Sequence, residues 1–355
     1  MKYNLDVLSD YIDRGLVIKQ NHPTLPLSIY NYSRTCQYDG MWDDITLNCR
    51  GLVLDNEGNV IAKPFPKFFN YEEHKPEDIP NETFEVYEKM DGSLGIFFHY
   101  AGEWHMATRG SFESEQAIKG MEIAKKYNYD TFCVPGFTYL FEIIYPENRI
   151  VVDYGKEERL VLLGIMNPNG EELPYEEIVD DGWDIVYRYE GLGEAYDLLK
   201  EKISKDEEGY VIRFSGGMRM KIKGDEYVRL HRILTNFSTK DIWELLKNGE
   251  DLAPLLERVP DEFDDWVKRT AMNLRYSFYS IDERAGKLHD GFRYGKFNDR
   301  YPEPTKKEFA EYVKQFPKEL SAVMFKMWDN QPYDYIIWNM VKPKYEKPFR
   351  NDDEN

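Results

Sequence analysis

The chain has 355 residues, of which 42% are hydrophobic and 15% aromatic, so it can bury enough apolar surface for two domains. Its formal net charge is −19, which excludes nucleic-acid binding through bulk positive charge and leaves only a local basic cluster for such contacts. Three widely spaced cysteines, no signal-peptide stretch at the N-terminus and apolar runs too short to span a bilayer predict a reduced, cytoplasmic protein with no membrane partner.

Residues 1–237 alternate short segments rich in β-branched and aromatic residues with turn residues. Few helical segments intervene, so we expect an α+β domain of antiparallel sheets with flanking helices. Helices are expected at Ser114–Tyr127 and Leu192–Ile203. Strands are expected at Gly51–Leu54, Phe84–Lys89, Leu94–Tyr100, Glu103–Thr108, Thr138–Tyr145, Arg159–Met166, Tyr210–Phe214 and Met218–Lys223.

The pattern becomes helical from Ser238, which is a suitable N-cap for the apolar positions that follow. Further helices are expected at Asp261–Arg284 and across Thr305–Val341, with breaks at Pro317 and Pro332. We therefore expect a mostly α-helical C-terminal domain of residues 238–355 after the α+β domain of residues 1–237.

Lys89 ends an expected strand and is followed by Asp91 and Gly92. A lysine amine can attack phosphorus, a carboxylate two residues later can organise a divalent cation, and glycine permits a tight turn beside a nucleotide. The motif alone is weak, because most lysines in such a pattern are solvated turn residues. Its support has to come from the residues around it.

Two basic residues on either side of Lys89 have both a functional and a structural interpretation. Lys67 and Phe69 share parity in an extended chain, which places a cation beside an aromatic ring, either for a nucleotide or as a surface lysine next to a core ring. Arg109 precedes an expected helix, either as part of an anion site at its N-terminus or as part of an ordinary capped helix start.

Two carboxylates and two lysines occupy apolar strands. Glu142 is the only charge in its strand and needs a partner, either a cation such as Arg149 or a ribose hydroxyl or metal-bound water. Glu208 begins another apolar strand. In the returning strand, Lys221 and Lys223 alternate with apolar residues, so both amines point to one face. That face is either solvated or lines a cleft that holds a polyphosphate.

Taken in order, these motifs resemble the phage-type RNA ligase 1 family of the covalent lysyl-nucleotidyltransferase superfamily. The helical C-terminal segment fits that family, whereas DNA ligases and capping enzymes have a β-barrel OB domain after the paired lysines. The similarity runs from about Ile29 to His231 and includes Tyr30–Tyr32, Cys49–Gly51, Lys67–Asn70, Lys89–Leu94, Gly110–Ser111, Phe141–Glu142, Glu208–Val211 and Lys221–Lys223.

The resemblance implies that Lys89 becomes a lysyl-adenylate and that Glu208, Lys221 and Lys223 are catalytic. Arg109 falls where the family usually has lysine, and these two residues are not interchangeable. A metal ion, Mg²⁺ or Mn²⁺, is implied at Asp91, Glu142 and Glu208 through water. The implied ATP-binding residues are Tyr30, Arg50, Lys67, Phe69, Gly92, Arg109, Glu142 and Tyr227.

The implied partners are RNA strands with 5′-phosphate and 3′-hydroxyl ends, with RNA repair as the process and nicked tRNA as a candidate substrate. A monomer is compatible with the sequence. The alternatives are a DNA ligase, a capping-type enzyme, or a non-catalytic nucleotide-dependent binder of RNA ends. Because a free lysine has a pKa of about 10.4, we expect Lys221, Lys223, a metal ion and partial burial to lower the pKa of Lys89.

Overall fold

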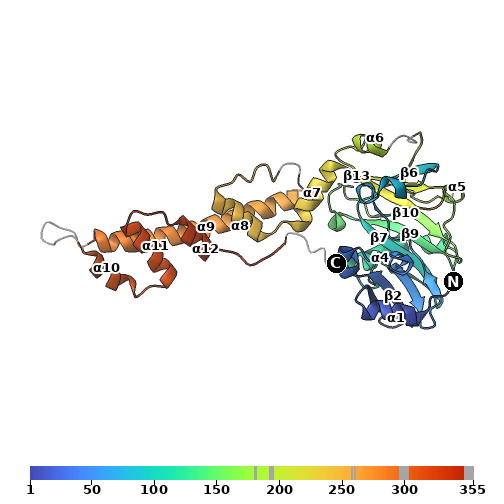
Figure 1. Ribbon diagram of the computed structural model, residues 1–355, viewed down its shortest axis with the longest axis horizontal. Helices are drawn as coiled ribbons and strands as arrows, with labels where there is room; N and C mark the ends of the chain where they lie inside the picture. The colour runs from blue at the N-terminus through green and yellow to red at the C-terminus, as the bar shows by residue number, and fades with distance from the viewer. Residues whose placement is uncertain (180–181, 192–195, 257–258, 260, 296–303, 348–355) are drawn as a thin grey trace. The chain divides into compact units, whose positions relative to one another are not determined.

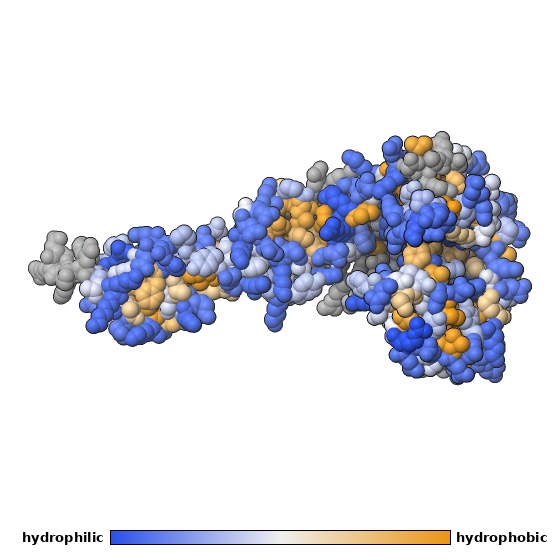
Figure 2. Space-filling model, in the orientation of Figure 1, coloured by the Kyte–Doolittle hydropathy of each residue, from blue (hydrophilic) through white to orange (hydrophobic). Residues whose placement is uncertain are grey.

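The computed structural model describes residues 1–179, 182–191, 196–256, 259, 261–295 and 304–347. The chain divides into two compact units, residues 1–231 and 232–350, and each is considered by itself. The expected boundary at 237/238 stays a prediction. No helix in the described ranges is long and apolar enough to cross a membrane. The face drawn in Figure 2 is mostly hydrophilic, with scattered hydrophobic patches.

Two antiparallel sheets form the body of the first unit (Figure 1). Apolar side chains of β2, β3 and β4 pack against those of β7, β8 and β9, including Leu27, Val53, Ile96 and Leu140. The first sheet has the order β1 (Val17–Asn21), β2 (Leu27–Tyr32), β3 (Arg50–Asp55) and β4 (Val60–Ala62). The second has the order β10 (Arg159–Met166), β9 (Thr138–Ile144), β7 (Ser93–Tyr100) and β8 (Glu103–Ala107).

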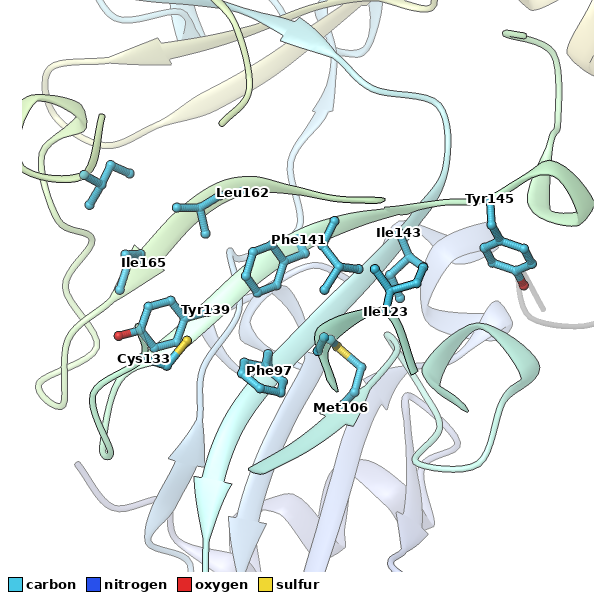
Figure 3. Close-up of a cluster of buried hydrophobic side chains, with 13 residues drawn as sticks. Phe97, Met106, Ile123, Cys133, Tyr139, Phe141, Ile143, Tyr145, Leu162 and Ile165 are labelled. Carbon is cyan, nitrogen blue, oxygen red and sulfur yellow. The ribbon is translucent and has the colours of Figure 1, made fainter. Parts of the chain in front are cut away.

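The other face of the second sheet is covered by helix α4 (Glu115–Lys126). Tyr139, Phe141 and Ile143 alternate along β9 and point to this face, as the two-residue period of a strand requires (Figure 3). They pack with Ile123 of α4, so the sheet is buried on both sides. A sheet buried on both faces gives a rigid support for any charged side chain at its edge.

A third sheet has the order β11 (Arg188–Tyr189), β6 (Phe84–Lys89), β12 (Gly209–Phe214), β13 (Arg219–Lys223) and β5 (Phe69–Asn70). All its described pairs are antiparallel except the short parallel pair of β13 with β5. Gly209 of β12 lies opposite both Lys89 of β6 and Lys223 of β13. This register brings the lysine of the K-x-D-G motif alongside the paired-lysine hairpin.

The remaining helices of the first unit are short, except for α7 at its end. They are α1 (Leu5–Asp13), α2 (Arg34–Asp39), α3 (Asp44–Asn48), α5 (Tyr175–Ile178), α6 (Tyr196–Glu201) and α7 (Asp225–Asn236), which continues into the second unit. The expected helix at Leu192–Ile203 is seen as α6, and its first residues, 192–195, lie outside the described part of the chain.

The second unit is helical. In Figure 1 the helices α8, α11 and α12 lie along the long helix α9, and the contacts agree. Phe309, Val323 and Ile337 are among its fully buried side chains. The bounds are α8 (Thr239–Asn248), α9 (Asp261–Arg293), α10 (Lys306–Val313), α11 (Lys318–Trp328) and α12 (Asp334–Met340).

The α+β class, the antiparallel sheets and the helical C-terminal region are confirmed. The expected strands are all present, within one or two residues at each end. Among the elements not predicted are the helices α1 and α7 and the strands β1 and β2, which are two of the four strands of the first sheet. The two breaks near Pro317 and Pro332 are observed before α11 and α12.

Candidate active site

A cavity of about 400 Å³ opens in the first unit and is lined by residues from all three sheets. Most of the predicted site residues line it, although they are far apart in the sequence. They are Arg50, Lys67, Lys89, Asp91, Gly92, Arg109, Glu142, Glu208, Lys221, Lys223 and Tyr227. Apolar side chains, including Leu163, Val186 and Val211, complete the lining.

Glu208 joins the two lysines that the third sheet brings together. Its Oε2 lies 2.8 Å from Nζ of Lys89, and its Oε1 lies 2.9 Å from Nζ of Lys223. Glu208 is buried, so a carboxylate there is stabilised only because both of its oxygens meet an ammonium group. The two lysines lower the pKa of Glu208, although burial alone would raise it. Glu208 is therefore ionised.

The backbone at Gly209 sets this geometry. Its φ is +144°, and a Cβ there would lie 2.0 Å from the carbonyl oxygen of Ile222 on the neighbouring strand. Only glycine tolerates both the conformation and the close approach. Gly209 therefore allows Glu208 to lie at the strand end, between Lys89 and Lys223.

Without a metal ion, the pKa shifts of two cavity lysines have opposite signs, and that of Lys89 is opposite to the lowering expected with a metal ion bound. Burial lowers the pKa of Lys221 to about 7, and neighbouring cations add to the shift: Lys89, Lys67, Lys223 and Arg50. Burial also acts to lower the pKa of Lys89, but the carboxylates Glu208, Glu142 and Asp91 outweigh it and raise that pKa.

Glu142 lies on β9 and faces the cavity. Burial raises its pKa to about 8, with Lys89 opposing the shift. Arg149, the structural partner considered from the sequence, instead lies 3.1 Å from Asp153. A partly buried carboxyl group with so high a pKa and a place in the cavity wall fits the second possibility, a hydroxyl or a metal-bound water.

Asp91 is engaged with protein groups. Its Oδ2 accepts hydrogen bonds from the backbone N–H groups of Val151 and Val152, both 2.8 Å away, and its Oδ1 accepts one from the Tyr227 hydroxyl at 2.7 Å. These bonds fix Tyr227 and the 151–152 segment in place. The geometry gives Asp91 a positioning role, and the metal contact implied by the resemblance stays a prediction.

Glycine is required at position 92 because of packing against the second sheet. Its φ is not in the left-handed region, and a Cβ there would lie 2.7 Å from the carbonyl oxygen of Ile143 on β9. The glycine is therefore required for contact between the K-x-D-G loop and the second sheet, which places Lys89 near Glu142.

A cluster of cations surrounds Tyr32 at another part of the lining. Nη1 of Arg109 donates to the Tyr32 hydroxyl over 3.4 Å, and Nζ of Lys67 lies 5.7 Å from the ring centroid. Arg50 lies over the ring of Phe68 at 5.8 Å, as Lys221 does at 5.9 Å. Several cations beside aromatic rings form a site suited to phosphate and base together.

Tyr30 does not line the cavity, contrary to expectation. It is 3% exposed and packs in the core with Leu8 and Leu52. Tyr32, two residues later, is the tyrosine at the cavity. Because Tyr30 and Tyr32 have the same parity in the strand, the alternation of side chains could not tell which of them reaches the cavity.

Phe69 is also absent from the lining, where Phe68 is found instead. The parity argument is right that Lys67 and Phe69 lie together, since Nζ of Lys67 is 5.1 Å from the Phe69 ring. Phe69 packs edge-on against Trp42 at 5.3 Å and so supports the lysine from behind. Arg109 does not open a helix, because α4 begins at Glu115 with Ser114 as its N-cap.

A divalent cation fits this site only with other ligands. In the described residues, no group of three or more His, Cys, Asp or Glu side chains is arranged to hold a metal ion. Glu142 nevertheless presents a carboxyl group to the cavity beside Glu208. This donor set fits a hydrated ion shared with a phosphate-bearing ligand, as is common for Mg²⁺.

A comparison with known protein families covers the segment that contains this cavity. A protein-family model described as RNA ligase matches residues 48–227, just over half of the chain. The matched segment contains all the cavity-lining residues predicted from the sequence, from Arg50 to Tyr227. The chain belongs to the RNA ligase family.

Individual relatives of this RNA ligase are distant. An RNA ligase of Rhodothermus phage RM378 is 25% identical over 85% of this chain and 84% of its own length. A protein of Autographa californica nuclear polyhedrosis virus, named as a bifunctional polynucleotide kinase/RNA ligase, is 26% identical over 68% of this chain, which spans only 40% of it. A solved archaeal ATP-dependent RNA ligase is 15% identical to this chain, and the match covers 93% of this chain and 96% of that one with a TM-score of 0.46.

Proposed function

We propose that the chain joins RNA ends that carry a 5′-phosphate and a 3′-hydroxyl, using ATP and forming a covalent AMP adduct on Lys89. The observation that supports this most directly is the Lys89–Glu208–Lys223 bridge, with distances of 2.8 and 2.9 Å, at the wall of one cavity. A protein that only bound a nucleotide would not need a buried lysine held against a carboxylate at the phosphate end. The fixed cations would stabilise charge that develops on the α-phosphate.

In the first step the Lys89 amine forms a bond to the α-phosphorus of ATP, and the bond to the bridging oxygen breaks to release pyrophosphate. The amine must first lose a proton, and Glu208 Oε2 is the carboxylate oxygen within hydrogen-bonding distance to receive it. Lys221 and Lys223 face the same cavity and would hold the phosphates. Positioning and charge stabilisation carry most of the catalysis in phosphoryl transfer.

A divalent cation, Mg²⁺ or Mn²⁺, would neutralise phosphate charge and lower the pKa of Lys89 when bound. Glu142 and Glu208 are the residues that would hold it, through water. Asp91 would act at a distance by keeping Tyr227 and the 151–152 segment in place.

Two further transfers complete the reaction. The 5′-phosphate of an RNA attacks the phosphorus of the lysyl-adenylate, so that the Lys89–phosphorus bond breaks and AMP moves to the RNA end. A 3′-hydroxyl then attacks the activated 5′-phosphate, and AMP leaves. We propose RNA repair as the process and nicked tRNA as the first substrate to test, with residues 238–355 as a domain that bears on substrate choice.

Labelled ATP tests the proposal directly. With Mg²⁺ or Mn²⁺ the full chain should retain label covalently, and Lys89→Ala should retain none. Lys75→Ala is a matched control, because Lys75 is an exposed lysine of the same unit that does not line the cavity. An adduct in Lys89→Ala would remove Lys89 from its role. Tight ATP binding without any adduct would support a non-catalytic binder instead.

The same assay separates the related enzymes. Labelled GTP in place of ATP would indicate a capping-type enzyme, and sealing of DNA but not RNA strands would indicate a DNA ligase. We expect ATP and RNA to be preferred in both comparisons. Nicked anticodon-loop RNA, single-stranded RNA and duplex RNA should then be compared as substrates.

A further inference from the structure

Helix α2 is held rigidly beside the cavity. The Ser33 hydroxyl caps it by accepting a hydrogen bond from the backbone N–H of Cys36 at 3.0 Å, and Gly40 ends it in the left-handed conformation. Cys36 is fully buried and anchors the inner side of the helix. A short helix fixed at both ends presents its outer side chains in a defined place.

The outer side of α2 carries an exposed aromatic ring and a cation. Tyr38 is 88% exposed, and Arg34 lies one turn earlier on the same face of the helix. Met41, 45% exposed, follows the Gly40 cap. Because the Tyr38 ring lies almost wholly in water, it is available to stack against a ligand.

The adjacent residues connect this surface to the cavity. Gln37 lines the cavity together with Tyr32 and Lys67. The Trp42 ring packs edge-on against Tyr32 at 5.0 Å, and Nζ of Lys67 lies 5.8 Å from its centroid. The exposed surface of Arg34, Tyr38 and Met41, named here the α2 surface, is therefore continuous with the cation cluster around Tyr32.

We propose that the α2 surface binds the RNA strand next to its reacting end, with a nucleobase stacked on Tyr38 and a phosphate near Arg34. This inference rests on the proposed RNA ligase function and adds the residues that hold the strand outside the cavity. Aromatic rings flanked by basic residues bind single strands in this way, with little dependence on base identity.

The charges around the α2 surface limit how it can bind. Asp39 and Asp44 are both exposed and lie within ten residues of Arg34 in the sequence, so this segment has little net positive charge. Stacking must then provide most of the affinity, and the salt dependence should be shallow, with a slope near one phosphate contact. A single ring with one methionine is also far smaller than the area of about 800 Å² that a stable protein partner covers.

Steady-state kinetics of the full chain test the proposal with a 5′-phosphorylated single-stranded RNA. Tyr38→Ala should raise the KM for RNA on the order of 10-fold, and Tyr38→Phe should restore it, because the ring rather than the hydroxyl does the stacking. Arg34→Ala should raise the KM about 3-fold and flatten the salt dependence. Formation of the labelled AMP adduct should be equal in all of these variants, since Tyr38 and Arg34 do not line the cavity.

Tyr127→Ala is the matched control, because Tyr127 is 47% exposed in the same unit and does not line the cavity. An unchanged KM in Tyr38→Ala with normal adduct formation would overturn the proposal that the α2 surface binds RNA, and it would leave the ligase proposal intact. A KM raised equally by Tyr127→Ala would also overturn it. If the unaltered chain forms no adduct, the ligase proposal itself fails, and RNA binding measured by fluorescence anisotropy in the same variants decides the α2 surface separately.

Discussion

Two regions of one cavity shift the pKa of a lysine in opposite directions. At the end of β6, Lys89 is paired with Glu208, and the nearby carboxylates raise its pKa. On β13, Lys221 faces other cations and its pKa falls to about 7. The two side chains belong to the same sheet, and both line the cavity. The difference is therefore one of neighbouring charge, because burial acts to lower both values.

This difference in pKa indicates that the two regions have different roles in the proposed first step. The paired region holds the nucleophile in place and provides an acceptor for its proton. The cation region of Lys221, Arg50 and Lys67 is electrostatically unfavourable by itself and becomes favourable when a polyphosphate binds. The cations are already in place in the free protein, and a bound polyphosphate would relieve the repulsion between them.

Replacing the Glu208 carboxylate should remove the pairing that distinguishes Lys89 from Lys221. Glu208→Gln leaves Lys89 and Lys223 without their common anion, so adduct formation from labelled ATP should fall on the order of 10²–10³-fold. Glu207→Gln is the neighbouring control, since Glu207 does not line the cavity, and should retain the rate. Equal adduct formation in the two variants would show that the bridge is not used.

A backbone change should weaken the paired region without changing any charge. Gly209→Ala places a Cβ 2.0 Å from the Ile222 carbonyl oxygen at a φ of +144°, so the free energy of unfolding should fall by about 3 kcal/mol. Gly217→Ala controls for the conformation alone, because its φ is +89° and nothing lies within 4 Å of the added Cβ. It should cost about 1 kcal/mol.

Chemical denaturation of the two glycine variants measures the difference. Gly209→Ala should also reduce adduct formation, since any shift of the strand end moves Glu208 away from the lysines. A stability loss no larger than that of Gly217→Ala would mean that the neighbouring strand moves aside, and the argument for a fixed Glu208 would be lost.

The sequence alone predicts the placement of residues that depends only on a local pattern. Lys221 and Lys223 face one side because strands alternate, and Glu208 was recognised as a charge at the head of an apolar strand. That Glu208 lies between Lys89 and Lys223 depends on the register of three strands, which no local pattern reports. The sign of the Lys89 pKa shift follows from this pairing, so it too could not be obtained.

The errors have the same origin in long-range geometry. Tyr30 and Tyr32 have equal parity and both are buried, so only their positions in the fold show that Tyr32 reaches the cavity and Tyr30 does not. The hydrogen-bond partners of Asp91, residues 151–152 and Tyr227, lie far along the chain, so the sequence could not show them, and its contact with a metal ion stays a prediction. Helix α2 gave no signal, since an exposed tyrosine is visible only once the fold is known.

The cation region can be tested by counting protons. At pH 8 an amine with a pKa of about 7 is mostly neutral, and a bound polyphosphate should raise that pKa again, so ATP binding should take up close to one proton. At pH 6 Lys221 is already protonated and the uptake should vanish. Titration calorimetry in two buffers of different ionisation enthalpy measures this number. Lys221→Arg should bind ATP without proton uptake at pH 8, because arginine stays charged. If the uptake persists in Lys221→Arg, the proton binds to another group, and the pKa of Lys221 is not the one that distinguishes the two regions.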